Sequence, residues 1–166
     1  MTEQTTERTL TRRSVVKGAA WAAPVLALAV ATPARAASMT DIGAFEIEGS
    51  CGVLGVLGPG FELTASPDAP IPAGTTIQIN GSGIANIGVF TATPAIADVA
   101  ILSPTSRSIT LTADVPAGST VALRTTLSIS VAFTLEASVN LPTGYTATGA
   151  KTTGSVSATL ALCSAS

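Results

Sequence analysis

The sequence contains no histidine among its 166 residues, and it contains only two cysteines. Without histidine the chain cannot build a Ser-His-Asp triad or a histidine-ligated metal site, and two thiolates are too few for a four-thiolate zinc site. The glycines around Cys51 lack the lysine of a phosphate-binding P-loop and do not open a helix. We therefore expect no catalytic residue, no metal site and no cofactor.

Aromatic residues are also scarce, since the chain has four Phe, one Tyr and one Trp. Protein-binding hot spots favour Trp, Tyr and Arg, and exposed Trp or Tyr would be expected in a sugar-binding site. The single Trp, Trp21, lies near the N-terminus, and Tyr145 directly follows a turn motif. The aromatic content therefore gives little support to a sugar site or to a strong protein-binding hot spot.

The N-terminus has the three parts of an export signal. Residues 1–17 are polar and basic, residues 18–31 are uncharged and mostly apolar, and a small-residue A-x-A site follows at Ala34 and Ala36. This order predicts a helical signal peptide that is cleaved before Ala37. The apolar run is shorter than the ~20 residues of a membrane span, so we expect no permanent span. A retained anchor and a buried N-terminal helix are the alternatives.

The stretch TRRSVVK, residues 11–17, resembles the twin-arginine export motif through Arg12, Arg13 and Lys17. It departs from the usual pattern at Val15, where that family has Phe or Leu. The resemblance implies export of an already folded protein, with the twin-arginine translocase and a signal peptidase as partners. In overall composition the chain is similar to small secreted or cell-surface proteins of high-GC Gram-positive bacteria that carry such signals, a group that mostly lacks assigned functions.

Removal of the predicted signal, residues 1–36, leaves residues 37–166. These 130 residues suit a single domain with its own core. Three basic residues then face eight acidic ones, which gives a net charge of −5. An acidic domain repels phosphate backbones, so we expect no nucleic-acid partner.

Period-two alternation of apolar and polar residues dominates the predicted mature domain, and helix signals are scarce. Short alternating segments are separated by turn residues at the spacing of a sandwich. We therefore predict an all-β, immunoglobulin-like β-sandwich of about seven to nine antiparallel strands. The expected strands are residues 42–47, 60–65, 75–80, 84–90, 99–102, 107–112, 120–125, 127–136 and 155–162.

Three turns share the pattern apolar-Pro-x-Gly, at residues 71–74, 115–118 and 141–144. The pattern predicts Pro as the second residue of a turn and Gly in the left-handed conformation after it. The first two lie in similar contexts, FELTASPDAPIPAGTTIQI and SITLTADVPAGSTVALR, which we interpret as one strand–turn–strand hairpin used twice, by duplication or by convergence. The third, LPTG, is similar to a sortase anchoring motif with one residue missing, but its sequence context favours a plain turn.

Cys51 and Cys163 are the two cysteines, and in an exported chain an even pair predicts a disulfide. Their wide separation and the absence of histidine or a nearby lysine favour a structural bond over a redox-active or nucleophilic thiol pair. A loop that encloses most of the domain would stabilise it by roughly 4–5 kcal/mol on the chain-entropy model.

Two further motifs bear on chemistry. Glu46 and Glu48 lie two apart on an expected strand and would share one face, with Phe45 and Ile47 on the other. Such a pair could serve acid–base catalysis or calcium binding, but solvation of a strand face is the favoured interpretation. The sequence K-T-T-G at Lys151 departs from the K-T-G of β-lactam-recognising enzymes by an intervening Thr, which argues against that activity.

The sequence thus favours a non-enzymatic, exported structural or interaction module at the cell surface or in the medium. A carbohydrate- or cell-wall-binding module is the alternative, and a carboxylate-based hydrolase is a remote one. A sugar-binding module would carry exposed aromatic residues on one face, and an enzyme would show a deep cleft with converging carboxylates. A structural subunit would show an unpaired apolar edge and self-associate.

Overall fold

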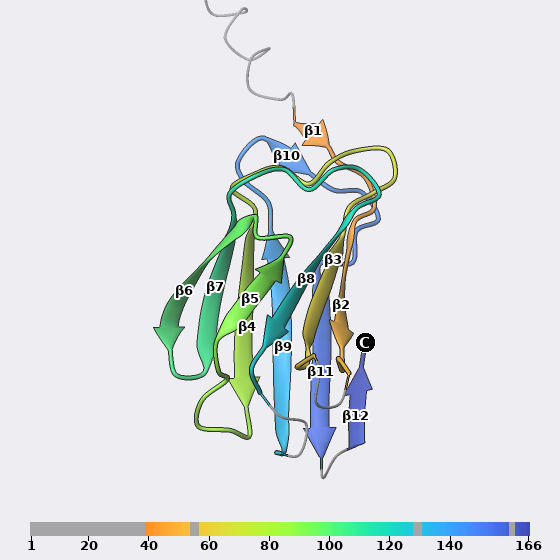
Figure 1. Ribbon diagram of the computed structural model, residues 1–166. Helices are drawn as coiled ribbons and strands as arrows, with labels where there is room; N and C mark the ends of the chain where they lie inside the picture. The colour runs from red at the N-terminus through yellow and green to blue at the C-terminus, as the bar shows by residue number, and fades with distance from the viewer. Residues whose placement is uncertain (1–38, 54–56, 128–130, 160–161) are drawn as a thin grey trace, which may run out of the picture. The chain divides into compact units, whose positions relative to one another are not determined.

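The computed structural model describes residues 39–53, 57–127, 131–159 and 162–166, which belong to one unit, Met39–Ser166. Ten of its strands form two sheets that pack as a sandwich (Figure 1). The residues assigned to the predicted signal peptide, 1–36, and to its cleavage site lie outside the described residues: Arg12, Arg13, Lys17, Ala34, Ala36 and Ala37.

The larger sheet has six strands in the order β12-β11-β9-β4-β7-β6, and the smaller has four in the order β2-β3-β8-β5. A separate parallel pair joins β1 and β10. The strands are β1 (Thr40–Asp41), β2 (Glu46–Ser50), β3 (Gly60–Thr64), β4 (Thr76–Ser82), β5 (Phe90–Thr93), β6 (Ala97–Ser103), β7 (Ser106–Leu111), β8 (Thr120–Thr125), β9 (Phe133–Asn140), β10 (Tyr145–Thr146), β11 (Thr153–Thr159) and β12 (Leu162–Ala165).

The strand order confirms the immunoglobulin-like sandwich. In chain order β2, β3, β4, β5, β8, β9 and β11 correspond to strands A to G, because the small sheet then has the order A-B-E-D and the large sheet contains G-F-C. Two additions bring the sheets to ten strands, above the predicted seven to nine. A β6–β7 hairpin extends the large sheet beyond β4, and β12 extends it beyond β11.

The core follows from the alternation that the sequence shows. Along β9 and β11 every second residue is buried, and the four phenylalanines of the chain all lie in the core. Each large apolar side chain that is fully buried contributes about 1.5–3 kcal/mol. The largest of these side chains are Phe45, Phe61, Ile47, Leu63, Ile71, Ile77, Ile79, Ile87, Ile109, Leu111, Leu123 and Leu135.

Several predicted strands match the structure and others do not. The prediction for 120–125 is confirmed by β8, and those for 60–65 and 107–112 each differ from β3 and β7 by about a residue per end. The strand predicted at 84–90 is wrong, because β5 begins only at Phe90. Glycines with φ of 76° and 75°, Gly83 and Gly88, bend the chain before it.

Three further predicted boundaries need correction. The predicted segment 42–47 becomes a strand only from Glu46, where β2 begins. The alternating segment 127–136 is replaced by β9, which starts at Phe133, while 128–130 lie outside the described residues. The segment 155–162 is divided between β11 and β12, which pair with each other as an antiparallel hairpin. Alternation alone does not reveal where a chain reverses direction.

The two repeated Pro-x-Gly segments are not hairpins, which corrects the prediction. Each connects one sheet to the other, since β3 leads to β4 and β7 leads to β8. Both glycines have the predicted positive φ, 83° at Gly74 and 69° at Gly118. Pro72, however, is the first residue of its turn rather than the second, because its carbonyl accepts a hydrogen bond from Thr75 N–H at 3.3 Å. The two connections lie side by side and pair through Ile71 and Val115.

Candidate functional site

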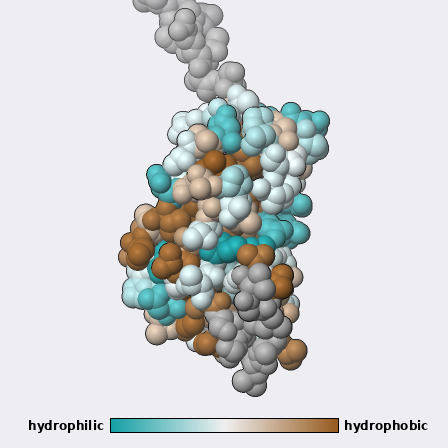
Figure 2. All heavy atoms as spheres, in the orientation of Figure 1, coloured by the Kyte–Doolittle hydropathy of each residue, from teal (hydrophilic) through white to brown (hydrophobic). Residues whose placement is uncertain are grey.

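Strand β6 forms one edge of the large sheet and exposes apolar side chains. Ile101 is 69% exposed and Leu102 is 59% exposed. The sequence of the strand, ADVAILS, has Asp98 as its one charged residue and contains neither lysine nor proline. Figure 2 shows hydrophobic residues gathered on the side of the unit where β6 lies in Figure 1. An edge with so little charge is a template for pairing with another strand.

The register of β6 on β7 shows which main-chain groups are free. Thr112 N–H donates to the Ile96 carbonyl at 2.8 Å, and Asp98 lies opposite Thr110 in the same ladder. Hydrogen-bonded and non-bonded pairs alternate in an antiparallel ladder. Asp98 and Ala100 therefore direct their N–H and C=O groups towards β7. Ala97, Val99 and Ile101 direct theirs away from the sheet, where no other strand of the described segments pairs with them.

The inner face of β6 reaches beyond the smaller sheet. Ala97 and Val99 are half-buried against the core, whereas Ile101, on the same face, is exposed. The register shifts between Ile101 and Ser103, so Leu102 sits in an irregularity that ends the regular edge. The regular part of the β6 edge, which we define as residues 97–101, is therefore five residues long.

A buried arginine holds the far end of β6 in place. Arg107 is 3% exposed, and its guanidinium donates to the carbonyls of Ser103, Ser106 (2.9 Å) and Gly88 (2.7 Å). No carboxylate forms an ion pair with it in the described ranges. Carbonyl dipoles thus replace a counter-ion and tie the β6–β7 turn to the loop before β5. Sequence reasoning missed this role, although Arg107 lies in phase with the inward-facing Ile109 and Leu111.

The opposite side of the sandwich is closed. The predicted disulfide is confirmed: Cys51, just after β2, is bonded to Cys163 on β12, and their Cα atoms are 5.9 Å apart. Gly49 N–H donates to the Ser166 carbonyl at 3.0 Å. A Cβ on Gly49 would lie 1.8 Å from the Ser155 carbonyl oxygen, so only glycine permits β2 to approach β11 this closely. We call this arrangement the closed seam.

The carboxylates of β2 lie on the outer face of the small sheet, and one of them is ion-paired. Glu46 and Glu48 share the outer face, as predicted, while Phe45 and Ile47 are buried. Glu48 forms an ion pair with Lys151, whose Nζ lies 3.1 Å from Glu48 Oε1. On the neighbouring strands Glu62 pairs with Arg124. Glu48 and Glu62 are thus each paired with a cation. No group of three or more metal-ligating side chains occurs among the residues that the structure describes.

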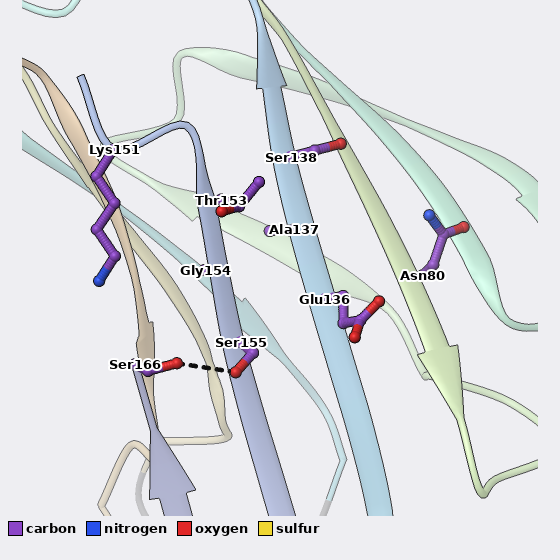
Figure 3. Close-up of a pocket in the computed structure, with 9 residues that line it drawn as sticks. All are labelled: Asn80, Glu136, Ala137, Ser138, Lys151, Thr153, Gly154, Ser155 and Ser166. Atoms are coloured by element: carbon purple, nitrogen blue, oxygen red, sulfur yellow. Dashed lines mark hydrogen bonds between the residues drawn. The ribbon is translucent and has the colours of Figure 1, made fainter. Parts of the chain in front are cut away.

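A groove of about 500 Å³ lies over β4, β9 and β11 (Figure 3). Its polar lining includes Asn80, Glu136 and Ser138, together with Ser155, whose hydroxyl bonds that of Ser166 at 2.9 Å. Glu136 is the one acidic side chain among the described lining residues. The groove can offer hydrogen bonds to a hydroxyl-rich ligand, whereas a glycosidase uses a pair of acidic side chains.

The remaining sequence motifs have structural surroundings that explain them. Lys151 of the K-T-T-G sequence donates a hydrogen bond from its ammonium group to the Glu48 carboxylate. The LPTG segment forms a turn, with φ of 94° at Gly144 and a bond of 3.3 Å from Tyr145 N–H to the Pro142 carbonyl. Tyr145 is 38% exposed and is the one exposed aromatic side chain on the described surface.

Asp41 anchors the β1–β10 pair at one end of the sandwich. Its carboxylate accepts hydrogen bonds from the Thr148 hydroxyl (2.6 Å) and from the N–H groups of Thr148 (3.0 Å) and Gly43 (2.9 Å). These bonds, with that from the Thr148 side chain the strongest, hold the pKa of Asp41 below its usual value. The lowered pKa of Asp41 thus follows from hydrogen bonds within the same end of the sandwich.

Within the described parts of the chain, no helix is long and apolar enough to cross a membrane. No protein-family model, no curated protein and no solved structure matches the sequence or the fold of the chain.

Proposed function

We propose that this chain is an exported, non-enzymatic structural or interaction module that acts at the cell surface or in the medium. One observation carries the proposal. The β6 edge presents free main-chain groups and exposed Ile101, whereas the opposite side is a closed seam. Assembly by strand addition needs an open sheet edge, and protection of the opposite edge limits unwanted pairing there.

The two competing functions receive less support. A sugar-binding module is expected to expose several aromatic side chains on one face, whereas the described surface exposes Tyr145 alone. A hydrolase would need carboxylates that converge on a cleft, whereas Glu48 and Glu62 are each engaged in an ion pair. The unpaired apolar edge expected of a structural subunit is present as β6.

Export by the twin-arginine pathway is the second part of the proposal. The formed disulfide agrees with an oxidising location outside the cytoplasm. The full chain should be expressed in a high-GC Gram-positive host with Arg12→Lys and Arg13→Lys together. Loss of the protein from the medium and wall fractions is expected, and the exported wild type should begin at Ala37. Undiminished export of the variant would contradict this route.

The interaction role is tested with isolated cell walls and with the exported protein purified from that host. Ile101→Lys places a charge on the β6 edge, and Leu162→Lys is the matched control, because Leu162 is 78% exposed on β12 at the other edge of the large sheet. We expect wall capture or self-association that Ile101→Lys abolishes and Leu162→Lys preserves. A wild type that neither binds walls nor self-associates would contradict the proposal.

The groove supports carbohydrate or cell-wall-polymer binding as the alternative function. An amide, a carboxylate and hydroxyl groups line it, which suits the hydroxyls of a sugar. Glu136→Gln and Asn80→Ala should then weaken wall capture while Ile101→Lys leaves it unchanged. The opposite pattern favours the β6 edge.

A further inference from the structure

We infer that the partner of the β6 edge is a second copy of this chain, added antiparallel about a two-fold axis at Val99. The inference rests on the proposed function and identifies the partner to which the interaction module binds. The two large sheets would then join into one continuous sheet across the axis, through the regular edge, residues 97–101. Such an interface is isologous, because each copy contributes the same strand.

The free main-chain groups of the β6 edge pair fully with their own copies in this register. Val99 lies opposite Val99 of the second copy, and Ala97 lies opposite Ile101. All three residues direct N–H and C=O groups outward, as the β6–β7 ladder requires. Every outward group of the five-residue edge therefore gains a partner. A shift by one residue would place outward groups opposite inward ones and lose the ladder.

The side chains of the edge complement each other in size in the same register. On the inner face, exposed Ile101 meets the small Ala97 of the second copy, so two large side chains do not collide. On the outer face, Asp98 meets Ala100 rather than another carboxylate. The irregularity at Leu102 lies beyond the paired segment and limits its length.

The number of open edges favours a closed dimer over a filament. On the opposite side of the sandwich, β12 and β2 are joined by the disulfide and by the bond from Gly49 to Ser166. The free edge of the small sheet, β5, has four residues, whereas β6 has seven. Each described unit therefore offers one long edge, and two such edges satisfy each other.

The charge of the edge gives the dimer a distinctive salt dependence. In the proposed register the two Asp98 residues are diagonal neighbours, about 7–8 Å apart. Their repulsion weakens as salt screens it, so raised salt should strengthen the dimer. A basic foreign partner would be attracted by Asp98 and would show the opposite trend.

The test uses the exported protein, purified without truncation, in sedimentation equilibrium at several salt concentrations. We expect a dimer that tightens as salt rises, that Ile101→Lys weakens by about tenfold or more, and that Asp98→Asn tightens. Leu162→Lys should leave the dissociation constant unchanged. A Val99→Cys variant should form a disulfide-linked dimer under mild oxidation, whereas Ser103→Cys, outside the paired segment, should not.

The outcomes separate this inference from the proposed function. A monomer at the highest attainable concentration, or a dimer unaffected by Ile101→Lys, overturns the second copy as partner. If such a monomer is still captured by cell walls and Ile101→Lys abolishes the capture, the proposed function stands with a foreign partner. If neither capture nor dimerisation occurs, both fail.

Discussion

Ile71 and Val115 exchange two main-chain hydrogen bonds, of 3.0 and 2.9 Å, although each lies in a different connection between the two sheets. Both side chains are buried in the core. The pair therefore links the two crossings that carry the chain from one sheet to the other, β3 to β4 and β7 to β8. The repeated sequence pattern thus builds one shared structure rather than two independent hairpins.

Truncation of this pair should show strong coupling. We expect Ile71→Ala and Val115→Ala each to lower the free energy of unfolding by about 2–4 kcal/mol, because each leaves a cavity at a fully buried site. In the double variant the loss should fall short of the sum by at least about 0.5 kcal/mol, since the two residues are direct neighbours. Chemical denaturation measures the free energy of unfolding of the two single variants and the double variant. Val89→Ala, at an exposed position, is the control. Strict additivity would contradict the shared structure.

The disulfide should add stability without being required for folding. Cys51 and Cys163 are only partly buried and lie at the closed seam, outside the cluster of fully buried residues. Because their sequence separation is 112, the bond should contribute roughly 4–5 kcal/mol on the chain-entropy model. The Cys51→Ser, Cys163→Ser double variant should therefore still unfold cooperatively, at a lower temperature. Calorimetry that shows no cooperative transition would contradict this expectation.

The local pattern predicted the sandwich but not its edges. Strands such as β3, β7 and β8 were predictable because their inward side chains follow a strict period of two. The role of β6 as an edge was not, since its sequence indicates a strand without indicating a neighbour. Pairing depends on where the rest of the chain places other strands, and this information is not local.

The candidate site shows the same division. The disulfide was predictable because two cysteines allow one pairing. The approach of β2 to β11 at Gly49 depends on a contact between distant segments, and nothing in the surrounding sequence indicates it. Polar residues on alternating positions predicted the outer face of β9. The groove above that face was not predictable, because it also needs β4 and β11 to lie beside β9 in a particular register.

Acid should weaken the contribution of Asp41 to stability. Hydrogen bonds from Thr148 and Gly43 lower the pKa of this carboxylate in the folded protein. Its contribution is therefore complete above the unfolded pKa, about 4, and is lost as the pH falls through the lower folded pKa. Asp41→Asn should reduce the melting temperature at pH 7, and the difference from wild type should shrink in acid.

Thermal melts of both proteins between pH 7 and pH 2 measure this effect. Thr148→Val removes the strongest of the donors to Asp41 and should reproduce part of the change. A difference between wild type and Asp41→Asn that stays constant over the whole pH range would show that the carboxylate contributes nothing through its charge.

Arg107 should be essential for the position of the β6–β7 turn. Its guanidinium supplies donors to two segments at once, the turn at Ser103 and the loop at Gly88. Arg107→Met keeps an apolar stem but leaves those carbonyl oxygens without a donor, so we expect a loss of about 2–4 kcal/mol. Arg107→Lys should recover little, because an ammonium group lacks the planar fork that spans both segments.

Hydrogen exchange distinguishes this local role from general destabilisation. In Arg107→Met the amides at 86–88 and 103–106 should lose protection before those of β9 or β11, since the hydrogen bonds of the arginine side chain go to the former segments. Ser108→Ala, on the outer face of the same strand, is the matched control and should change exchange little. Because the turn ends the β6 edge, the Met variant should also weaken any assembly through β6. Uniform loss of protection throughout the sandwich would show instead that the buried charge supports the whole core and not this turn.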